Sequence, residues 1–263
     1  MGLSGAMAVH AQAVRTLKEV LQLKMTSDKG ANGGNVAWHP VQKKYYAAIS
    51  GNAAHQMGIY DVKGNMVSKP EQQTLFDVRG LWYNPATHTL QANGYKKNGW
   101  VEYTLDDKGI PVSVKPLFEG SHQPDDQSVG AFDPKTNLVY FFDNTNLGLS
   151  AYNVKDGNFV NTIDIFLNIK SKEQKDTTID TNEDLKENYN LSSVIFTGIK
   201  NQEIGLLSFF NKRIELYNLS TGMLTQVLNL PADAPVTDFL NFSYANDTYW
   251  LFDNKARIWK GYK

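Results

Sequence analysis

The chain has 263 residues, of which 41% are hydrophobic and 12% are aromatic, and this is enough apolar material for one large all-β domain or two small ones. Its formal net charge of −1 excludes a broad basic field for neutralising phosphates, so nucleic acid is not expected as a partner. The absence of cysteine excludes disulfides, thiolate nucleophiles and cysteine-based metal sites.

The first residues are small and apolar, and Val9-His10-Ala11 fits the small-x-small pattern that precedes a signal-peptide cleavage site. We therefore expect residues 1–13 to be the remnant of a secretion signal or a disordered terminus, and the protein to be exported to the periplasm or the cell exterior. A positively charged start is missing, so a chance match is the alternative. No apolar run is long enough to span a bilayer, and no membrane span is expected.

A short pattern recurs along the rest of the chain: an aromatic, a polar and an apolar residue, then a polar turn closed by Gly. The full copies begin at Tyr60, Tyr103, Tyr152 and Tyr217, and a shorter relative begins at Trp259. The aromatic and apolar residues lie two apart and share one strand face, while the polar turn suits a connection between antiparallel strands. The pattern predicts a repeated hairpin.

Two further strands separated by a tight turn precede each copy. The first strands are expected at 35–40, 80–85, 130–137, 194–198 and 239–243, and the second strands at 45–50, 89–92, 138–142, 204–208 and 248–252. A fourth strand follows the Gly turn at 65–76, 110–118, 159–166 and 223–230. Four antiparallel strands per repeat form the blade of a β-propeller. The sequence predicts an all-β, five-bladed β-propeller of four-stranded blades in a single domain over residues 14–263, with six blades as the alternative.

The fifth block lacks a fourth strand, and a candidate lies near the other end of the sequence. Leu17–Leu23 closely resembles Leu224–Leu230, the outer strand expected in the fourth block. We therefore expect residues 14–23 to be the outer strand of the last blade and to close the ring, which leaves few exposed sheet edges. An amphipathic helix is the alternative, because apolar residues of this stretch also fall at helical spacing.

The segment from Asn168 to Asn190 interrupts the repeats. It is rich in Lys, Asp, Glu, Thr and Asn and has almost no apolar residues, so it is not expected to pack as a strand. We expect a mobile insertion between the third and fourth blades, either a solvated loop or a lid over the ligand.

The blocks resemble, at the level of the fold, the NHL-like and YVTN-like repeats of secreted bacterial β-propellers. The Trp-Asp and Gly-His signatures of WD40 blades are absent. The resemblance implies a ligand or partner surface at one end of the central channel, formed by the loops that enter the first strands and the loops between the second and third strands. It implies no reaction, because propellers include binding modules, hydrolases, lyases and lactonases.

Carboxylates near the entry to the first strands are the catalytic candidates if the protein is an enzyme. They are Asp77, Asp126 with its neighbour Asp125, and Asp238. Ring closure is expected to bring them to one rim of the channel. Five-bladed glycosidases resemble this layout, and in them two carboxylates at the channel act as acid and base or as acid and nucleophile. The alternative is that they serve local turns through hydrogen bonds to the backbone.

The loops at the same end of the channel carry aromatic, amide and cationic side chains that suit a sugar, a peptide or an anionic ligand. The candidate ligand-binding residues are His55, Gln56, Arg79, Tyr95, Lys97, Asn144, Phe210 and Asn211.

No metal site is expected from the histidines, since none are paired at zinc-ligand spacing. His39 and His88 are expected on the face opposite the ligand, and His55 and His122 on the ligand side. No cofactor is predicted. Calcium is the alternative, with oxygen ligands from 143–146 or 253–254, although no Asp-x-Asp-x-Asp-Gly loop is present.

We therefore expect a monomeric, non-enzymatic, exported propeller that binds a small molecule, a glycan or a protein at the end of the channel where the second and third strands are joined. The alternative is a carbohydrate-active or lactone-active hydrolase using Asp77, Asp126 or Asp238.

Overall fold

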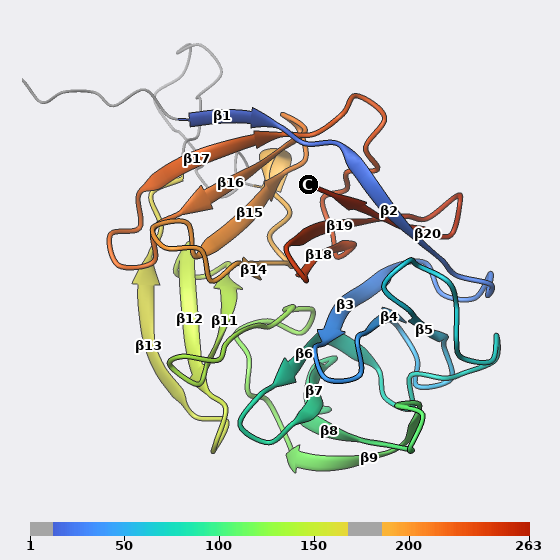
Figure 1. The fold of residues 1–263 in the computed structure, drawn as a ribbon. Helices are drawn as coiled ribbons and strands as arrows, with labels where there is room; N and C mark the ends of the chain where they lie inside the picture. Colours follow the sequence, from blue (N-terminus) through green and yellow to red (C-terminus); the bar gives the residue numbers. More distant parts are fainter. Residues whose placement is uncertain (1–12, 168–185) are drawn as a thin grey trace, which may run out of the picture.

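The computed structural model describes residues 13–167 and 186–263. Their strands form five sheets arranged in a ring around a central axis (Figure 1). The predicted all-β, five-bladed propeller is confirmed. Residues 1–12 and 168–185, on which most of the expected signal remnant and of the expected insertion fall, lie outside the described residues. Within the described ranges, no helix is long and apolar enough to cross a membrane.

Each blade starts at the axis and runs outward. The first blade contains β3 (Gly33–His39), β4 (Lys44–Ile49) and β5 (Met57–Tyr60). The second contains β6 (Val78–Asn84), β7 (Thr89–Gly94), β8 (Trp100–Leu105) and β9 (Pro111–Phe118). The third contains β10 (Ala131–Asp133), β11 (Leu138–Asp143), β12 (Gly148–Asn153) and β13 (Phe159–Asp164). The fourth contains β14 (Ile195–Phe196), β15 (Ile204–Ser208), β16 (Arg213–Tyr217) and β17 (Leu224–Asn229). The fifth contains β18 (Phe242–Ala245), β19 (Thr248–Asp253), β20 (Ile258–Tyr262) and β2 (Glu19–Lys24).

The glycine that closes each full copy of the hairpin pattern has a left-handed backbone. The φ angles of Gly64, Gly109, Gly157 and Gly222 are 82°, 71°, 69° and 67°. Side chains other than Gly rarely adopt this conformation, which explains why Gly recurs at the position.

Ring closure by the N-terminal strand is confirmed. β2 pairs antiparallel with β20, with Leu23 opposite Trp259. The side chain of Leu23 is fully buried between the fifth and first blades. The outer strand of the last blade therefore comes from the start of the described chain.

The beginning of the expected closing strand belongs to another blade. β1 (Ala13–Thr16) pairs in parallel with β17 and is the fifth strand of the fourth sheet. The chain then changes sheets within two residues: the N–H of Leu17 donates to Asn229 O and that of Lys18 to Lys263 O, both at 2.9 Å. A single outer strand over residues 14–23 was thus wrong in its first part, and the chain links two neighbouring blades.

The first blade lacks the regular outer strand expected at residues 65–76. Isolated bridges at Tyr60–Met66 and Gln56–Gln73 and scattered backbone hydrogen bonds connect this segment to the blade. Pro70 lies between them and has no N–H to donate, and the Gln72 N–H turns back to Lys69 O. The segment follows the sheet edge but cannot form a continuous ladder.

The hydrophobic core is divided into five clusters, one at each junction between neighbouring blades. At the junction of the fifth and first blades, for example, Trp250 and Trp259 pack with Tyr45. The wall of the ring is therefore built from blade-to-blade contacts, which leaves the axis free of a shared core.

The end of the expected insertion is packed against the fourth blade. Residues 186–188 are helical, and Tyr189 and Asn190 are buried at 2% and 0% exposure. The Tyr189 hydroxyl donates to the buried carboxylate of Glu215 at 2.7 Å. Polar composition had suggested solvent exposure, but these polar groups are buried with hydrogen-bond partners.

Candidate ligand-binding site

The ring has two different ends. The turn face carries the tight turns between the first and second strands of the blades, such as 40–43, 85–88 and 134–137. The loop face carries the connections between blades and the loops between the second and third strands, and it is the face where the ligand was expected.

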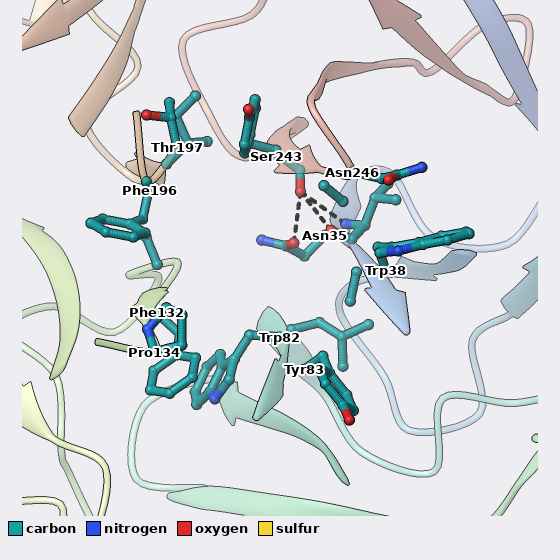
Figure 2. Close-up of a pocket in the computed structure, with 18 of the residues that line it drawn as sticks. Asn35, Trp38, Trp82, Tyr83, Phe132, Pro134, Phe196, Thr197, Ser243 and Asn246 are labelled. Carbon is teal, nitrogen blue, oxygen red and sulfur yellow. Dashed lines mark hydrogen bonds between the residues drawn. The ribbon is translucent and has the colours of Figure 1, made fainter. Parts of the chain in front are cut away.

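A central cavity opens toward the turn face and has a volume of about 420 Å³. All five inner strands line it, and Pro40, Pro85 and Pro134 stand at its rim. Figure 2 shows side chains from every blade surrounding this hollow. Its size lies in the usual range for small-molecule sites, which is about 300–1,000 Å³.

One aromatic side chain from each blade lines the cavity at an equivalent place near the end of the inner strand. These residues, which we call the aromatic ring, are Trp38, Tyr83, Phe132, Phe196 and Tyr244. In its blade, each aromatic residue pairs with the first or second residue of the second strand. Each also packs against a different one of the five core clusters between blades. The repeated sheet geometry thus arranges five aromatic groups around one axis, and Trp82 adds a sixth.

The polar side chains of the cavity mostly have partners in the protein. The Thr197 hydroxyl donates to Gln202 O at 2.6 Å, and the Asn246 amide donates to the Tyr45 hydroxyl at 2.6 Å. Asn35 and Ser243 bond to each other, with 2.7 Å between Ser243 Oγ and Asn35 Oδ1. Among the described residues, the lining contains no Asp, Glu, His, Lys or Arg.

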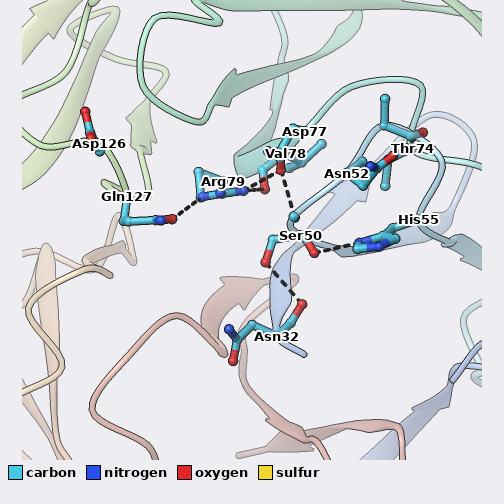
Figure 3. Close-up of polar contacts among 12 residues, drawn as sticks. Asn32, Ser50, Asn52, His55, Thr74, Asp77, Val78, Arg79, Asp126 and Gln127 are labelled. Atoms are coloured by element: carbon cyan, nitrogen blue, oxygen red, sulfur yellow. Dashed lines mark hydrogen bonds and ion pairs between the residues drawn. The ribbon is translucent and has the colours of Figure 1, made fainter. Parts of the chain in front are cut away.

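On the loop face, three of the expected residues form one cluster. Arg79 is only 4% exposed, and its Nη1 donates to Asp77 Oδ1 at 2.6 Å while its Nε donates to Gln127 Oε1 at 2.6 Å (Figure 3). The guanidinium lies 4.9 Å from the centre of the Tyr95 ring. Asp77 also accepts the N–H of Gly51 at 2.8 Å, so its carboxylate serves an ion pair and a turn.

A second hollow, of about 700 Å³, lies on the loop face, and Asp126, Asp238 and Asn144 line it. Asp77 is not among its lining residues. The structure thus brings two of the three candidate catalytic carboxylates to one hollow. Both are exposed, and Asp126 forms an ion pair with Lys96 at 3.3 Å.

The other expected ligand-binding residues are dispersed. Gln56 is 3% exposed, and its amide bonds to the backbone of Thr26 and Ser27 and to Pro70 O, which anchors the segment before β3. His55 is half-buried, with its Nδ1 2.8 Å from Ser50 O.

Three of them lie at loop tips. Lys97, Phe210 and Asn211 are exposed, Phe210 at 67%, and they line neither hollow.

The candidate calcium loops are organised as turns. Asp143 Oδ1 accepts the N–H groups of Thr145 and Asn146, and its Oδ2 accepts from the side chains of Asn146 and Ser150. Burial alone raises the pKa of Asp143, but these hydrogen bonds outweigh it and lower the pKa overall. Asp253 likewise accepts two backbone N–H groups and pairs with Lys260. In the described part of the chain, no group of three or more His, Asp or Glu is placed to hold a metal ion.

The aromatic ring was not predicted as a site, although the sequence carries a signal for it. In three blades the last residue but one of the inner strand is aromatic and stands two positions before Pro, at Trp38, Tyr83 and Phe132. Equivalent positions in a closed ring of repeats have the same orientation relative to the central axis, so this repetition was the available clue.

No protein-family model matches the chain, and no curated protein is found to be similar to it. Similar solved structures include a nidogen/laminin complex, with 13% identity over 85% of this chain and 73% of that chain, at a TM-score of 0.43. A streptogramin B lyase is 14% identical over 89% of this chain, with a TM-score of 0.42. The match covers 65% of the lyase chain, just under two thirds. A gluconolactonase from Xanthomonas campestris is 10% identical over 91% of this chain and 88% of its own, with a TM-score of 0.48. These similarities concern the fold alone and favour neither binding nor catalysis.

Proposed function

We propose that the protein is a non-enzymatic binding module whose ligand is a small neutral molecule with an apolar ring, held in the central cavity at the turn face. The observation that carries the proposal is the aromatic ring, five equivalent side chains around a cavity of about 420 Å³. This places the ligand at the opposite end of the channel from the loops favoured by sequence.

The lining of the cavity explains the choice of a neutral ligand. In the described part of the chain its only ionisable groups are tyrosine hydroxyls, so a charged ligand would lose hydration there without gaining a counter-charge. Aromatic faces pack well against flat or gently puckered rings, including the apolar face of a pyranose. The volume accommodates one substituted six-membered ring.

The hydrolase alternative has weaker support. Acid and base must flank one bond, but Asp77 is held in an ion pair with Arg79 at 2.6 Å and does not line the hollow that Asp126 and Asp238 share. Both of the latter are exposed to solvent, whereas a catalytic acid needs an environment that keeps its proton.

Ligand-observed NMR tests the proposal with two neutral probes, acetophenone as a planar ring and methyl β-glucopyranoside as a puckered one. We expect at least one probe to bind the wild-type protein, and Trp38→Ala to weaken it about tenfold or more. Phe210→Ala, which alters an exposed side chain outside the cavity, should leave binding unchanged.

Three results would count against the proposal. Failure of both probes to bind at millimolar concentration would overturn it. Binding that survives Trp38→Ala but is lost in Asp126→Asn would move the ligand to the loop face, and turnover of the glucoside would favour the hydrolase. Thermal unfolding of each variant identifies any loss of binding that results from loss of folding.

A further inference from the structure

The cavity contains one buried polar side chain that differs from the others. Asn35 is 6% exposed and lines the cavity. Its Oδ1 lies 2.7 Å from the hydroxyl oxygen of Ser243, the shorter of that hydroxyl's two donor contacts, the other being Val36 O at 3.0 Å. The same hydroxyl oxygen accepts the N–H of Val36 at 3.1 Å. Ser243 belongs to the fifth blade and Asn35 to the first, so the contact joins β18 to β3 across the closing junction of the ring.

These bonds direct the amide nitrogen of Asn35 toward the axis. With Oδ1 turned to Ser243, Nδ2 points into the centre of the cavity (Figure 2). Among the described residues, Nδ2 has no hydrogen-bond partner, and the atom is accessible from the cavity. Thr197 and Asn246 differ because their donor groups are already bonded to the protein.

A β-bulge explains why Asn35 points this way. In the pairing of β3 with β4, Gly33 lies opposite Ile49 and Val36 lies opposite Ala47, with a register shift between them. Gly34 and Asn35 therefore share one partner position on β4. A bulge of this kind changes the direction of a side chain and is frequent beside functional sites. A second bulge, between Val78 and Gly80, contains Arg79 in the next inner strand.

From this geometry we infer that Asn35 determines the ligand's specificity by donating a hydrogen bond to a carbonyl or hydroxyl oxygen carried by the apolar ring. The inference rests on the proposed function and names the class of ligand that the cavity takes. A ligand whose ring carries no hydrogen-bond acceptor would displace water from Nδ2 and leave this donor unpaired. A site built around such a hydrogen bond therefore discriminates against analogues that lack the acceptor.

The test compares acetophenone with ethylbenzene, which share the ring and the two-carbon substituent but differ in the carbonyl oxygen. Dissociation constants are measured by ligand-observed NMR for the wild-type protein, Asn35→Leu and Asn211→Leu. We expect the wild type to bind acetophenone about tenfold more tightly than ethylbenzene, and Asn35→Leu to bind the two about equally. Asn211→Leu, the same substitution at an exposed residue that does not line the cavity, should keep the wild-type preference.

Each outcome decides between the two claims. Equal binding of both probes by the wild-type protein overturns the inference and leaves the proposed function standing. A preference for acetophenone that persists in Asn35→Leu shows that another group recognises the oxygen. If neither probe binds, the inference fails, and the pyranoside titration decides whether the proposed function fails with it.

A second variant protects the test against a folding defect in Asn35→Leu. Ser243→Ala removes the hydroxyl that fixes the amide and keeps Asn35 in place, so the acetophenone preference should shrink without being reversed. An unchanged preference in Ser243→Ala would contradict the claim that this hydroxyl orients the donor.

Discussion

Replacing Leu23 by Ala tests whether β2 is an integral strand of the last blade. The Leu23 side chain is fully buried in the cluster between the fifth and first blades, beside Trp259 and Trp250. A buried Leu→Ala change costs about 2–5 kcal/mol, because apolar contacts are lost and a cavity remains. The net stability of a domain is about 5–15 kcal/mol, so the loss is a large share of the total.

Urea unfolding followed by tryptophan fluorescence measures this loss. With a dependence of about 1–3 kcal/mol per molar urea, the unfolding midpoint should fall by about 1 M or more. Val20→Thr is the matched control, since Val20 lies on the same strand, is 53% exposed and is replaced by another β-branched residue. Its stability should stay within about 0.5 kcal/mol of the wild type. If Leu23→Ala also stays within that range, β2 is an appendage and the closure of the ring lies elsewhere.

Further predictions concern the core, a glycine contact and acid sensitivity. Glu215→Ala should lower the free energy of unfolding, measured in urea, by about 3–5 kcal/mol. The substitution leaves the Arg213 guanidinium and the buried hydroxyls of Tyr189 and Tyr217 without their carboxylate. A loss below about 1 kcal/mol would contradict this account. Gly80→Ala should lower the free energy of unfolding by about 3 kcal/mol, because a Cβ at this position meets the backbone of the neighbouring blade. If the variant melts at the wild-type temperature, the close contact is refuted. Burial lowers the pKa of His39 from its ordinary 6.5, so the unfolded chain binds more protons just below that pH, and stability should fall as pH drops from about 7 to about 5. His39→Asn should flatten this pH dependence of the urea midpoint, whereas the control His122→Asn, in the loop between the second and third blades, should keep it; equal slopes in both variants would exclude His39 as the source.

The blades were predictable because their signal is local and repeated. The aromatic-polar-apolar-turn pattern at Tyr60, Tyr103, Tyr152 and Tyr217 requires only neighbouring residues to be read. The pairing of residues 13–16 with β17 was not predictable in the same way, because a four-residue strand carries too little pattern to specify which sheet edge it joins. Pro70, in contrast, was a visible reason to doubt a regular outer strand in the first blade.

The site was harder to predict than the fold, because the roles of its residues depend on long-range contacts. Gln56 was expected to bind ligand, but it is bonded to the segment 26–27, a contact set by how the chain crosses the ring. Asn35 was not selected, because its orientation depends on a bulge and on Ser243, 208 residues away in the sequence. Polar loop composition therefore favoured the loop face, whereas the tertiary structure forms an open, aromatic-lined cavity at the turn face.

The closing junction of the ring has a consequence for biosynthesis. β2 leaves the ribosome before any blade exists, yet its partner β20 is made only after all the other strands, and β1 must likewise wait for β17. At about 5–20 residues per second, β2 remains without its partner for on the order of ten seconds or more. During that time the nascent chain displays the apolar side of the first blade that later packs on Trp250 and Trp259. Ring closure therefore follows translation of the last blade, and until then the exposed apolar face of the first blade favours aggregation.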